Sequence, residues 1–496
     1  MDCTKTLPYL KRNPGGGGAT PSPDKIDNVY PQPEPSPGLE FDDQNYVVES
    51  WLDKKASSFS GGTGTKDDPY QISSPAELAY CYTAERQSLL RSRYAVLTND
   101  IILNDGFFDE SGTYHDGGDG ILNECFAIWF ENGTFDGQGH TIYGLYNEPL
   151  FKYIQNSTVK NLIIKNFCSN GSSSLGPTSA ATVENVTVYG KLFASNHNQV
   201  GGLFSFEYGG STIKNCKSYV DIECTGYYVG GIIGDGRASN YINCENHGKV
   251  SGRYIGGIMG RSTGSNFAVI DSCVNTGEIC TAGDAVGGGI AGSVKAVITN
   301  CVNSGNFFAS SSLAGICSIL EDGEIRDCKN FGNVFNGVIN NLRENAKVFN
   351  CENAFEGNCT NGLVKTCSGK IYRCVNKSNA TYGLANIVSE TGGIYECESL
   401  GDSIYYIANK INAGGEVKNC HFKGESLQAV GTNNGSLINI VYESSSNKEY
   451  YGTDFSKFFI TWKDQRIGLI AIESVGLYRG KLTEAYLIKK EFTKVA

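Results

Sequence analysis

Nine of the 18 cysteines recur at regular intervals from residue 216 onward. Successive members lie 28, 29, 28 and 27 residues apart, and then four times 23 residues apart. Thiols could bind a metal, form disulfides or pack in a core, but cysteines stacked one above another have parallel Cβ vectors, which suit a disulfide poorly. Free cysteine is also among the most buried residue types, so we expect structural thiols, with disulfides and metal binding as alternatives. The series comprises Cys216, Cys244, Cys273, Cys301, Cys328, Cys351, Cys374, Cys397 and Cys420.

An asparagine follows several of these cysteines by two residues, and in four repeats a glycine lies two residues further on. Asparagine tolerates the left-handed αL conformation, and stacked identical amides can hydrogen-bond to one another. We therefore expect these asparagines to lie at a bend in the αL conformation and to form a ladder. The predicted ladder contains Asn246, Asn275, Asn303 and Asn330.

Carboxylates at equivalent positions of neighbouring repeats could catalyse glycoside hydrolysis, which needs a pair roughly 5–9 Å apart. Few such pairs are found. Asp221 is replaced by Lys249 in the next repeat, and Asp235 is followed by Arg261, which predicts an ion pair rather than an acid–base couple. We therefore expect no catalytic residues and no enzymatic activity.

The densest acidic segment is residues 105–119, which contains four aspartates and one glutamate. It lacks the fixed ligand spacing of a calcium loop, so we expect a flexible loop, with Ca²⁺ binding as the alternative. The 5 histidines lie far apart in the sequence. No metal and no cofactor are expected.

Four tyrosines are candidates for binding a ligand. Tyr228 and Tyr254 each precede a Gly-Gly pair, in consecutive repeats, and would stack on one face. Such a pair could offer an aromatic platform to a sugar ring, although two stacked tyrosines can equally be lateral packing. Tyr405 and Tyr406 are similar candidates in a later repeat.

The elements that position these residues are short apolar runs separated by Gly, Asn or Ser. Examples are Val229-Gly-Gly-Ile-Ile-Gly234 and Ile255-Gly-Gly-Ile-Met-Gly260. A repeat of this length is too short for two helices with their loops and lacks helical periodicity, so each repeat is interpreted as one coil of a parallel β-solenoid. The predicted fold class is all-β, a single-stranded right-handed parallel β-helix with coils about 4.8 Å apart.

The recurring Val/Ile-Gly-Gly-Ile-x-Gly pattern resembles the GLUG motif of surface and phage proteins of bacteria. Residues 61–78 resemble the segment that precedes such β-helices, and residues 135–145 resemble their first full coil. The resemblance covers roughly residues 59–436. It implies a right-handed β-helix, and the family hosts adhesins and fibres.

The two ends of the chain differ from the repeats. Residues 1–58 are rich in Pro and Gly and are expected to be an extended anchor or tether, followed by an N-terminal cap and lead-in region at 59–135. Ser74-Pro75-Ala76-Glu77 is a capping box, and it predicts a capping helix that could continue to Leu89 and Leu90. The β-helix is assigned to 136–436. Residues 437–496 are expected to form a small α+β cap or head, with a hairpin at 458–472 and a helix at 483–490.

Composition and charge restrict the function. The net charge of −11 weighs against nucleic-acid binding, and no apolar run reaches the length of about 18 residues that membrane insertion requires. The N-terminus has no secretory signal pattern. A chain made in the cytoplasm with a tether, a rod and a terminal piece fits a non-enzymatic phage virion protein, namely a fibre, spike or head decoration.

The expected partners follow from this interpretation. Residues 1–58 would bind other virion proteins, the rod would bind a glycan or protein of the host surface, and a homotrimer is plausible by analogy with phage spikes. The first alternative is an adhesin on a bacterial cell surface, and the second is a polysaccharide depolymerase.

Overall fold

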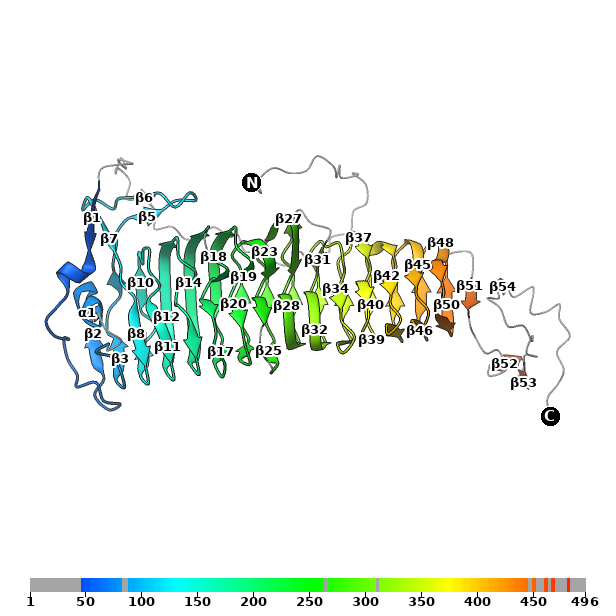
Figure 1. Cartoon of the computed structure of the whole chain (residues 1–496), viewed down its shortest axis with the longest axis horizontal. Coiled ribbons are helices and arrows are strands. Elements are labelled where there is room, and N and C mark those ends of the chain that lie inside the picture. Colours follow the sequence, from blue (N-terminus) through cyan, green and yellow to red (C-terminus); the bar gives the residue numbers. More distant parts are fainter. Residues whose placement is uncertain are drawn as a thin grey trace.

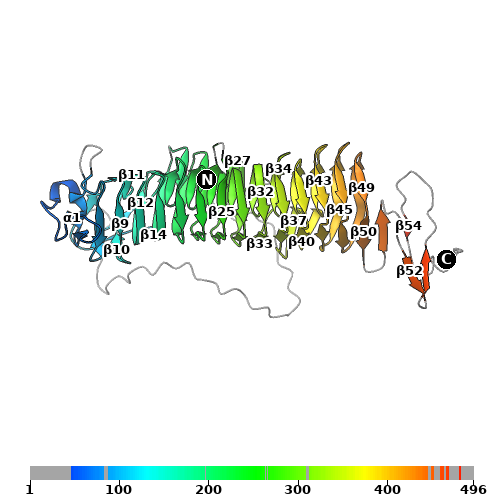
Figure 2. The same cartoon turned by 90° about the horizontal axis from the view of Figure 1, so that it is seen from below.

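The structure is a computed structural model of the chain. The residues that it describes are 46–82, 88–195, 197–262, 264, 266–308 and 312–444, together with strands at 448–451, 459–462, 465–468 and 480–481. The described chain forms a rod of stacked coils (Figures 1 and 2). Of the described strands, 45 are joined in one hydrogen-bonded network.

One coil illustrates the architecture. It contains β17 (Thr212–Lys214), β18 (Lys217–Cys224), β19 (Tyr228–Gly230) and β20 (Ile233–Gly236), and β21 (Asn240–Ile242) begins the next coil. Each strand pairs in parallel with its equivalent one coil later, so that β17 pairs with β21, β19 with β23 (Val250–Gly256) and β20 with β24 (Met259–Ser262). The predicted all-β parallel solenoid is confirmed, with about 14 turns.

Three ladders of strands run along the rod and continue this pattern. The first precedes the cysteine column and includes β25 (Ala268–Asp271), β35 (Lys347–Phe349), β39 (Lys370–Tyr372), β43 (Gly393–Tyr395), β46 (Glu416–Lys418) and β49 (Ser436–Ile438). The second follows the column and includes β22 (Glu245–Asn246), β26 (Val274–Asn275), β29 (Val302–Asn303), β33 (Lys329–Asn330), β36 (Glu352–Asn353), β40 (Val375–Asn376), β44 (Glu398–Ser399) and β47 (His421–Lys423). The third lies beyond the Gly-Gly bend and includes β16 (Phe204–Phe206), β28 (Ala291–Thr299), β32 (Cys317–Arg326), β34 (Ile339–Leu342), β38 (Val364–Cys367) and β42 (Ala385–Val388).

The cysteine series lies in the interior of the rod. All 17 described cysteines are buried and free of disulfides. The Sγ of Cys301 lies 3.1 Å from the carbonyl oxygen of Thr299, and the backbone N–H of Cys301 points at the Sγ of Cys328, 3.4 Å away in the next coil. Burial raises the pKa of the Cys301 thiol well above its usual value, because the thiolate would lose its hydration.

The asparagines after the cysteines form a second interior column. The side-chain amide of Asn246 donates to the Oδ1 of Asn275 at 2.8 Å, and Asn275 donates to Asn303 at the same distance. Each amide also donates to the carbonyl of the glycine two residues further on, as Asn246 does to Gly248 at 2.9 Å. Asn303 continues the column to Asn330.

The expected αL conformation is found at a different residue. The residues with positive φ directly precede the cysteines, for example Asn215 (53°), Asn243 (51°) and Asn300 (55°), whereas Asn246 and its equivalents are not among them. This position is where the chain turns sharply between two ladders. Its exposed amides form an outer ladder, in which the side chain of Asn243 donates to the Oδ1 of Asn215 at 2.8 Å.

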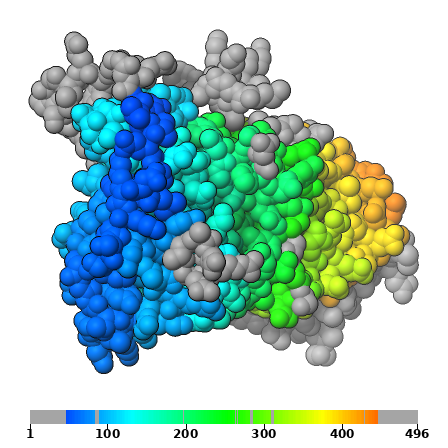
Figure 3. Space-filling model, turned by 60° about the vertical axis from the view of Figure 1, so that its left-hand side comes forward, coloured from blue at the N-terminus to red at the C-terminus, as the bar shows by residue number. Residues whose placement is uncertain are grey.

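At the N-terminal end, residues 46–58 of the expected tether contact the solenoid, while residues 1–45 lie outside the described residues. β1 (Val47–Ser50) pairs in parallel with β7 (Ile121–Glu124), and the short 3₁₀ helix η1 (Trp51–Lys54) follows. The indole Nε1 of Trp51 donates to the carbonyl of Leu103 at 2.9 Å. In Figure 3, β1 is the dark blue segment that runs over the surface of this end.

The prediction of a capping helix that continues to Leu89 and Leu90 is wrong, because the helix is much shorter. The helix α1 (Pro75–Tyr80) has only 6 residues, although it begins as predicted, with the backbone N–H of Glu77 donating to Ser74 Oγ at 3.3 Å. It ends at Tyr80 because the N–H of Cys81 bonds to the carbonyl of Leu78, which tightens the last turn. Leu90 is buried, but it lies in a turn rather than on a helix.

At the C-terminal end, parallel pairing continues as far as β50 (Ile440–Glu443), which then pairs antiparallel with β51 (Lys448–Tyr451). The predicted hairpin is present as β52 (Phe459–Trp462) and β53 (Gln465–Gly468). The described residues do not form the expected α+β domain, and its helix at 483–490 lies outside them.

We expect Asn303→Asp to destabilise the fold by about 3 kcal/mol at neutral pH, because a buried carboxylate would face the acceptor oxygens of Gly305 and Asn330. These surroundings raise the carboxyl pKa in the folded state, and a protonated carboxyl can donate. The loss relative to the parent chain is therefore smallest below about pH 4 and grows as the pH rises. Urea unfolding at several pH values measures it. Asn243→Asp, on the exposed ladder, is the control, and an equal loss in both variants would contradict the interior assignment.

We expect Glu396→Asn to stabilise the fold by about 0.5–1 kcal/mol. Glu396 has φ 56°, a conformation that asparagine adopts more readily, and the new amide could extend the outer ladder to Asn419. The midpoint of urea unfolding should rise. Glu398→Asn, the same substitution in the extended strand β44, should leave the midpoint unchanged or lower it.

Candidate functional site

The Gly-Gly bend between β19 and β20 brings outward-facing side chains together. A Cβ on Gly230 would lie 2.0 Å from the carbonyl oxygen of Ile233, and one on Gly231 would lie 2.2 Å from that of Gly257. Only glycine allows the chain to double back this closely. Side chains that precede the bend therefore lie near side chains that follow it. We call the resulting surface the arginine–aromatic patch; it contains Phe206, Tyr208, Tyr227, Tyr228, Arg237, Arg253, Tyr254 and Arg261, with Asp235 beneath them.

Tyr228 and Tyr254 occupy the same register in adjacent coils, as the sequence predicts. Their ring centroids are 5.5 Å apart, with the rings tilted by 39°. The guanidinium carbon of Arg261 lies 3.6 Å from the centroid of the Tyr228 ring, so that one face of this ring is covered. The pair therefore forms part of a mixed arginine–tyrosine surface rather than a flat platform.

The Asp235–Arg261 ion pair is present at the centre of the patch. Arg261 reaches the Oδ2 of Asp235 through Nη2 at 2.5 Å and Nε at 3.2 Å, and Gln199 donates to the same oxygen at 3.0 Å. The Asp235 side chain is fully buried, whereas 25% of the Arg261 side chain is exposed. A buried carboxylate needs such donors, so this pair holds the bend together and Arg261 is committed to it.

Arg237 and Arg253 differ from Arg261 because neither forms an ion pair with a carboxylate among the described residues. Arg253 lies 5.0 Å from the ring centroid of Tyr227, and Arg237 lies 4.9 Å from that of Phe206. Both guanidinium-bearing residues are exposed. The patch thus presents two cationic groups beside aromatic rings.

Two aromatic residues of the patch are exposed, whereas Phe206, Tyr228 and Tyr254 are half-buried. Tyr208 is 55% exposed and Tyr227 is 44% exposed. Sequence reasoning missed both tyrosines and both arginines, although one signal was readable, because Arg253 and Tyr227 directly precede the aligned Tyr254 and Tyr228.

The other two tyrosine candidates are placed differently. Tyr405 stacks on Tyr382 of the preceding coil, with centroids 5.6 Å apart, and is half-buried. Tyr406 is only 3% exposed and stacks on Tyr442 at 4.4 Å inside the last coils. Tyr406 is therefore a core residue that a ligand cannot reach.

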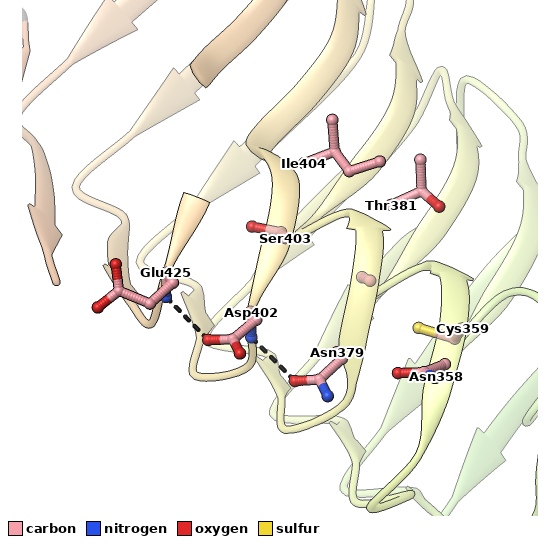
Figure 4. A pocket seen from close by; sticks show the side chains of 9 residues that line it. Asn358, Cys359, Asn379, Thr381, Asp402, Ser403, Ile404 and Glu425 are labelled. Carbon is pink, nitrogen blue, oxygen red and sulfur yellow. Dashed lines mark hydrogen bonds between the residues drawn. The ribbon is translucent and has the colours of Figure 1, made fainter. Parts of the chain in front are cut away.

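A shallow groove of about 350 Å³ lies farther along the rod and is lined partly by β37 (Asn358–Asn361) and β41 (Asn379–Tyr382). Sequence reasoning missed that Asp402 and Glu425 share a register there. Figure 4 shows the hydrogen bonds in this region: Asn379 Oδ1 accepts the N–H of Asp402 at 3.0 Å, and Asp402 Oδ1 accepts the N–H of Glu425 at 2.8 Å. The side chains of Asn379 and Asp402 thus each support the backbone of the next coil.

The acidic segment 105–119 contains the short antiparallel pair β5 (Phe107–Phe108) and β6 (Tyr114–His115). Carboxylate oxygens of Asp105, Asp116 and Asp119 lie within 4.8 Å of one another. Burial and the charges of the other two aspartates raise the pKa of Asp119. Backbone amides already bind two of these carboxylates, since the N–H groups of Gly118 and Gly120 donate to Asp116 at 3.0 Å and that of Ile121 donates to Asp119 at 2.8 Å.

Comparisons with known proteins give limited similarity. No protein-family model matches the chain. Halomucin of Haloquadratum walsbyi is 26% identical over 223 residues, which cover 37% of this chain and 2% of halomucin, so the chain spans only a small part of this relative.

Two solved structures are similar in part. One is described as a "putative immunoglobulin A1 protease" from Bacteroides ovatus, with 21% identity and a TM-score of 0.38 over 49% of this chain and 77% of that one. The other is bacteriophage CBA120 tailspike protein 3, with 10% identity and a TM-score of 0.23 over 82% of this chain and 67% of that one. At these scores neither similarity bears on the function of this chain. No helix in the described part of the chain has the length and apolar character to cross a membrane.

We expect Arg261→Met to destabilise the fold by about 3–5 kcal/mol, because it leaves the buried Asp235 carboxylate without its cation. The double variant Arg261→Met/Asp235→Leu should lose less than the single variant. Urea unfolding measures both. Arg343→Met, which breaks an exposed pair with Glu321, is the matched control and should cost less than about 1 kcal/mol; equal losses would contradict a central role for Arg261.

Proposed function

We propose that the chain is a non-enzymatic attachment protein whose rod presents the arginine–aromatic patch to a glycan on a host surface. The observation that carries this proposal is the accessibility of Tyr208, Tyr227, Arg237 and Arg253 on the two sides of the Gly-Gly bend in a continuously hydrogen-bonded solenoid. Exposed aromatic rings beside guanidinium groups are typical of recognition surfaces.

The parallel ladder suits this role because it makes the rod stiff. Each coil is tied to its neighbours by backbone pairing and by the interior amide and thiol columns, so a site on one coil is held in a fixed position along the axis. Side-chain oxygens that support the next coil, such as that of Asp402, serve the same purpose. A stiff rod that carries a binding site on its side suits attachment to a surface better than catalysis.

We assign the protein to a phage virion, as a fibre, spike or head decoration of the right-handed GLUG-type β-helix class. Of residues 1–58, those that precede β1 would anchor it to other virion proteins, and three copies would associate as in phage spikes. The alternative is an adhesin on a bacterial cell surface, which would use the same patch. Electron microscopy of virions and of cells, with an antibody against the rod, separates the two locations.

We expect the purified chain to block adsorption of the parent virion to its host and to release no reducing sugar from the host capsule. The double variant Tyr208→Ala/Tyr227→Ala should adsorb to host cells at least tenfold more weakly than the parent chain, because it lacks the two most accessible rings of the patch. Phe331→Ala removes an exposed ring outside the patch and serves as the control.

Two results would contradict this proposal. Release of reducing ends would favour the depolymerase alternative. Equal adsorption of the tyrosine double variant and the parent chain would place attachment on another surface.

A further inference from the structure

We infer that the arginine–aromatic patch recognises a polysaccharide built from uronic acids, that is, sugars that carry a carboxylate on the ring. This inference rests on the proposed attachment function and specifies the chemical class of its ligand.

The patch has an excess of positive charge on a negatively charged protein. Arg261 is neutralised by Asp235, whereas Arg237 and Arg253 have no carboxylate partner among the described residues. The nearby Glu207 is buried, and its carboxylate accepts the backbone N–H groups of Gly209 and Arg237 at 2.5 and 3.2 Å. Among the side chains that the structure describes, two exposed guanidinium groups therefore lack a carboxylate partner and can bind an anion, although the chain as a whole carries a charge of −11.

The chemistry of these groups favours a carboxylate attached to a sugar. A guanidinium group is planar and binds a carboxylate through two parallel hydrogen bonds. The guanidinium carbon of Arg253 lies 5.0 Å from the ring centroid of Tyr227, and that of Arg237 lies 4.9 Å from the ring centroid of Phe206. A uronic acid offers both features on one residue, since the apolar face of its ring can pack on the tyrosine while its carboxylate reaches the arginine.

The two arginines contact different aromatic residues of the patch. Arg253 lies over Tyr227, Tyr227 adjoins Tyr228, and Tyr228 is covered by Arg261. Arg261 binds the buried Asp235, which is aligned with Phe206, and Phe206 contacts Arg237. Two separate cationic groups fit a polymer with repeated carboxylates better than a single anion.

The acidic character of the remaining surface confines binding to the patch. A long polyanion of either kind, nucleic acid or polyuronate, would be repelled by the rod outside the patch, and a nucleic acid would need a larger cationic surface than two arginines provide. A short uronic-acid segment can contact the patch alone, with its carboxylates on the arginines and its sugar faces on the aromatic rings. The patch therefore favours a short segment of the polysaccharide.

The test uses the full chain and oligomers of mannuronate, glucuronate and galacturonate, each compared with its carboxyl-reduced counterpart. Calorimetric titration should show binding of at least one acidic oligomer that is at least tenfold tighter than its neutral counterpart. Arg237→Ala/Arg253→Ala should remove this preference, because both side chains are exposed and their loss should leave the fold intact. Arg253→Lys should retain part of it. Arg93→Ala, an exposed arginine on the N-terminal end, is the control for the change in charge.

The outcomes separate this inference from the proposed function. Equal binding of acidic and reduced oligomers, or an unchanged preference in the arginine double variant, overturns the uronic-acid assignment and leaves attachment standing. Absence of binding to all three acidic oligomers also overturns the assignment, as does tighter binding of polyphosphate or single-stranded DNA. Failure of the proposed function is recognised independently, when the parent chain does not block adsorption of the virion.

Discussion

The structure depends on one constraint: each coil hydrogen-bonds to the next with equivalent residues in register. Parallel pairing at a spacing of about 4.8 Å places each side chain directly above its equivalent in the next coil. Each residue must therefore be of a type that packs well against the equivalent residue of its neighbour. Cysteine and asparagine meet this requirement in the interior, because a small thiol packs on a thiol and an amide both donates to and accepts from an amide. Some charged residues meet it with opposite signs in adjacent coils, as Asp235 and Arg261 do.

The same constraint explains how much of the fold the sequence reveals. Regular cysteine spacing gives the coil length and the register, and from these the parallel solenoid follows. Spacing identifies equivalent residues but not their conformations. Asn243 and Asn246 both recur once per coil, and only the position of the turn decides that the first is in the αL conformation while the second is buried. For the same reason the short length of α1 was not predictable, since its last turn is set by the contacts of Cys81.

The candidate site was predictable only where it follows the register. Asp235 and Arg261 are aligned in adjacent coils, and their ion pair can be read from the sequence. The contact between Arg261 and Tyr228 crosses the Gly-Gly bend, and the contact between Arg237 and Phe206 is diagonal. Both depend on how sharply the chain folds back, which a single sequence does not contain. A solenoid therefore reveals its architecture through repetition, while its recognition surface lies where neighbouring repeats differ.

The buried thiols have a practical consequence. Since all 17 described cysteines lie in the interior, an alkylating reagent can reach a sulfur atom only after the surrounding coil has opened. The cysteines are distributed from Cys81 to Cys420, so the order in which they are labelled under mild denaturation records where the rod begins to fray. The chain thus contains its own set of position-specific reporters of local unfolding, with no need for an introduced probe.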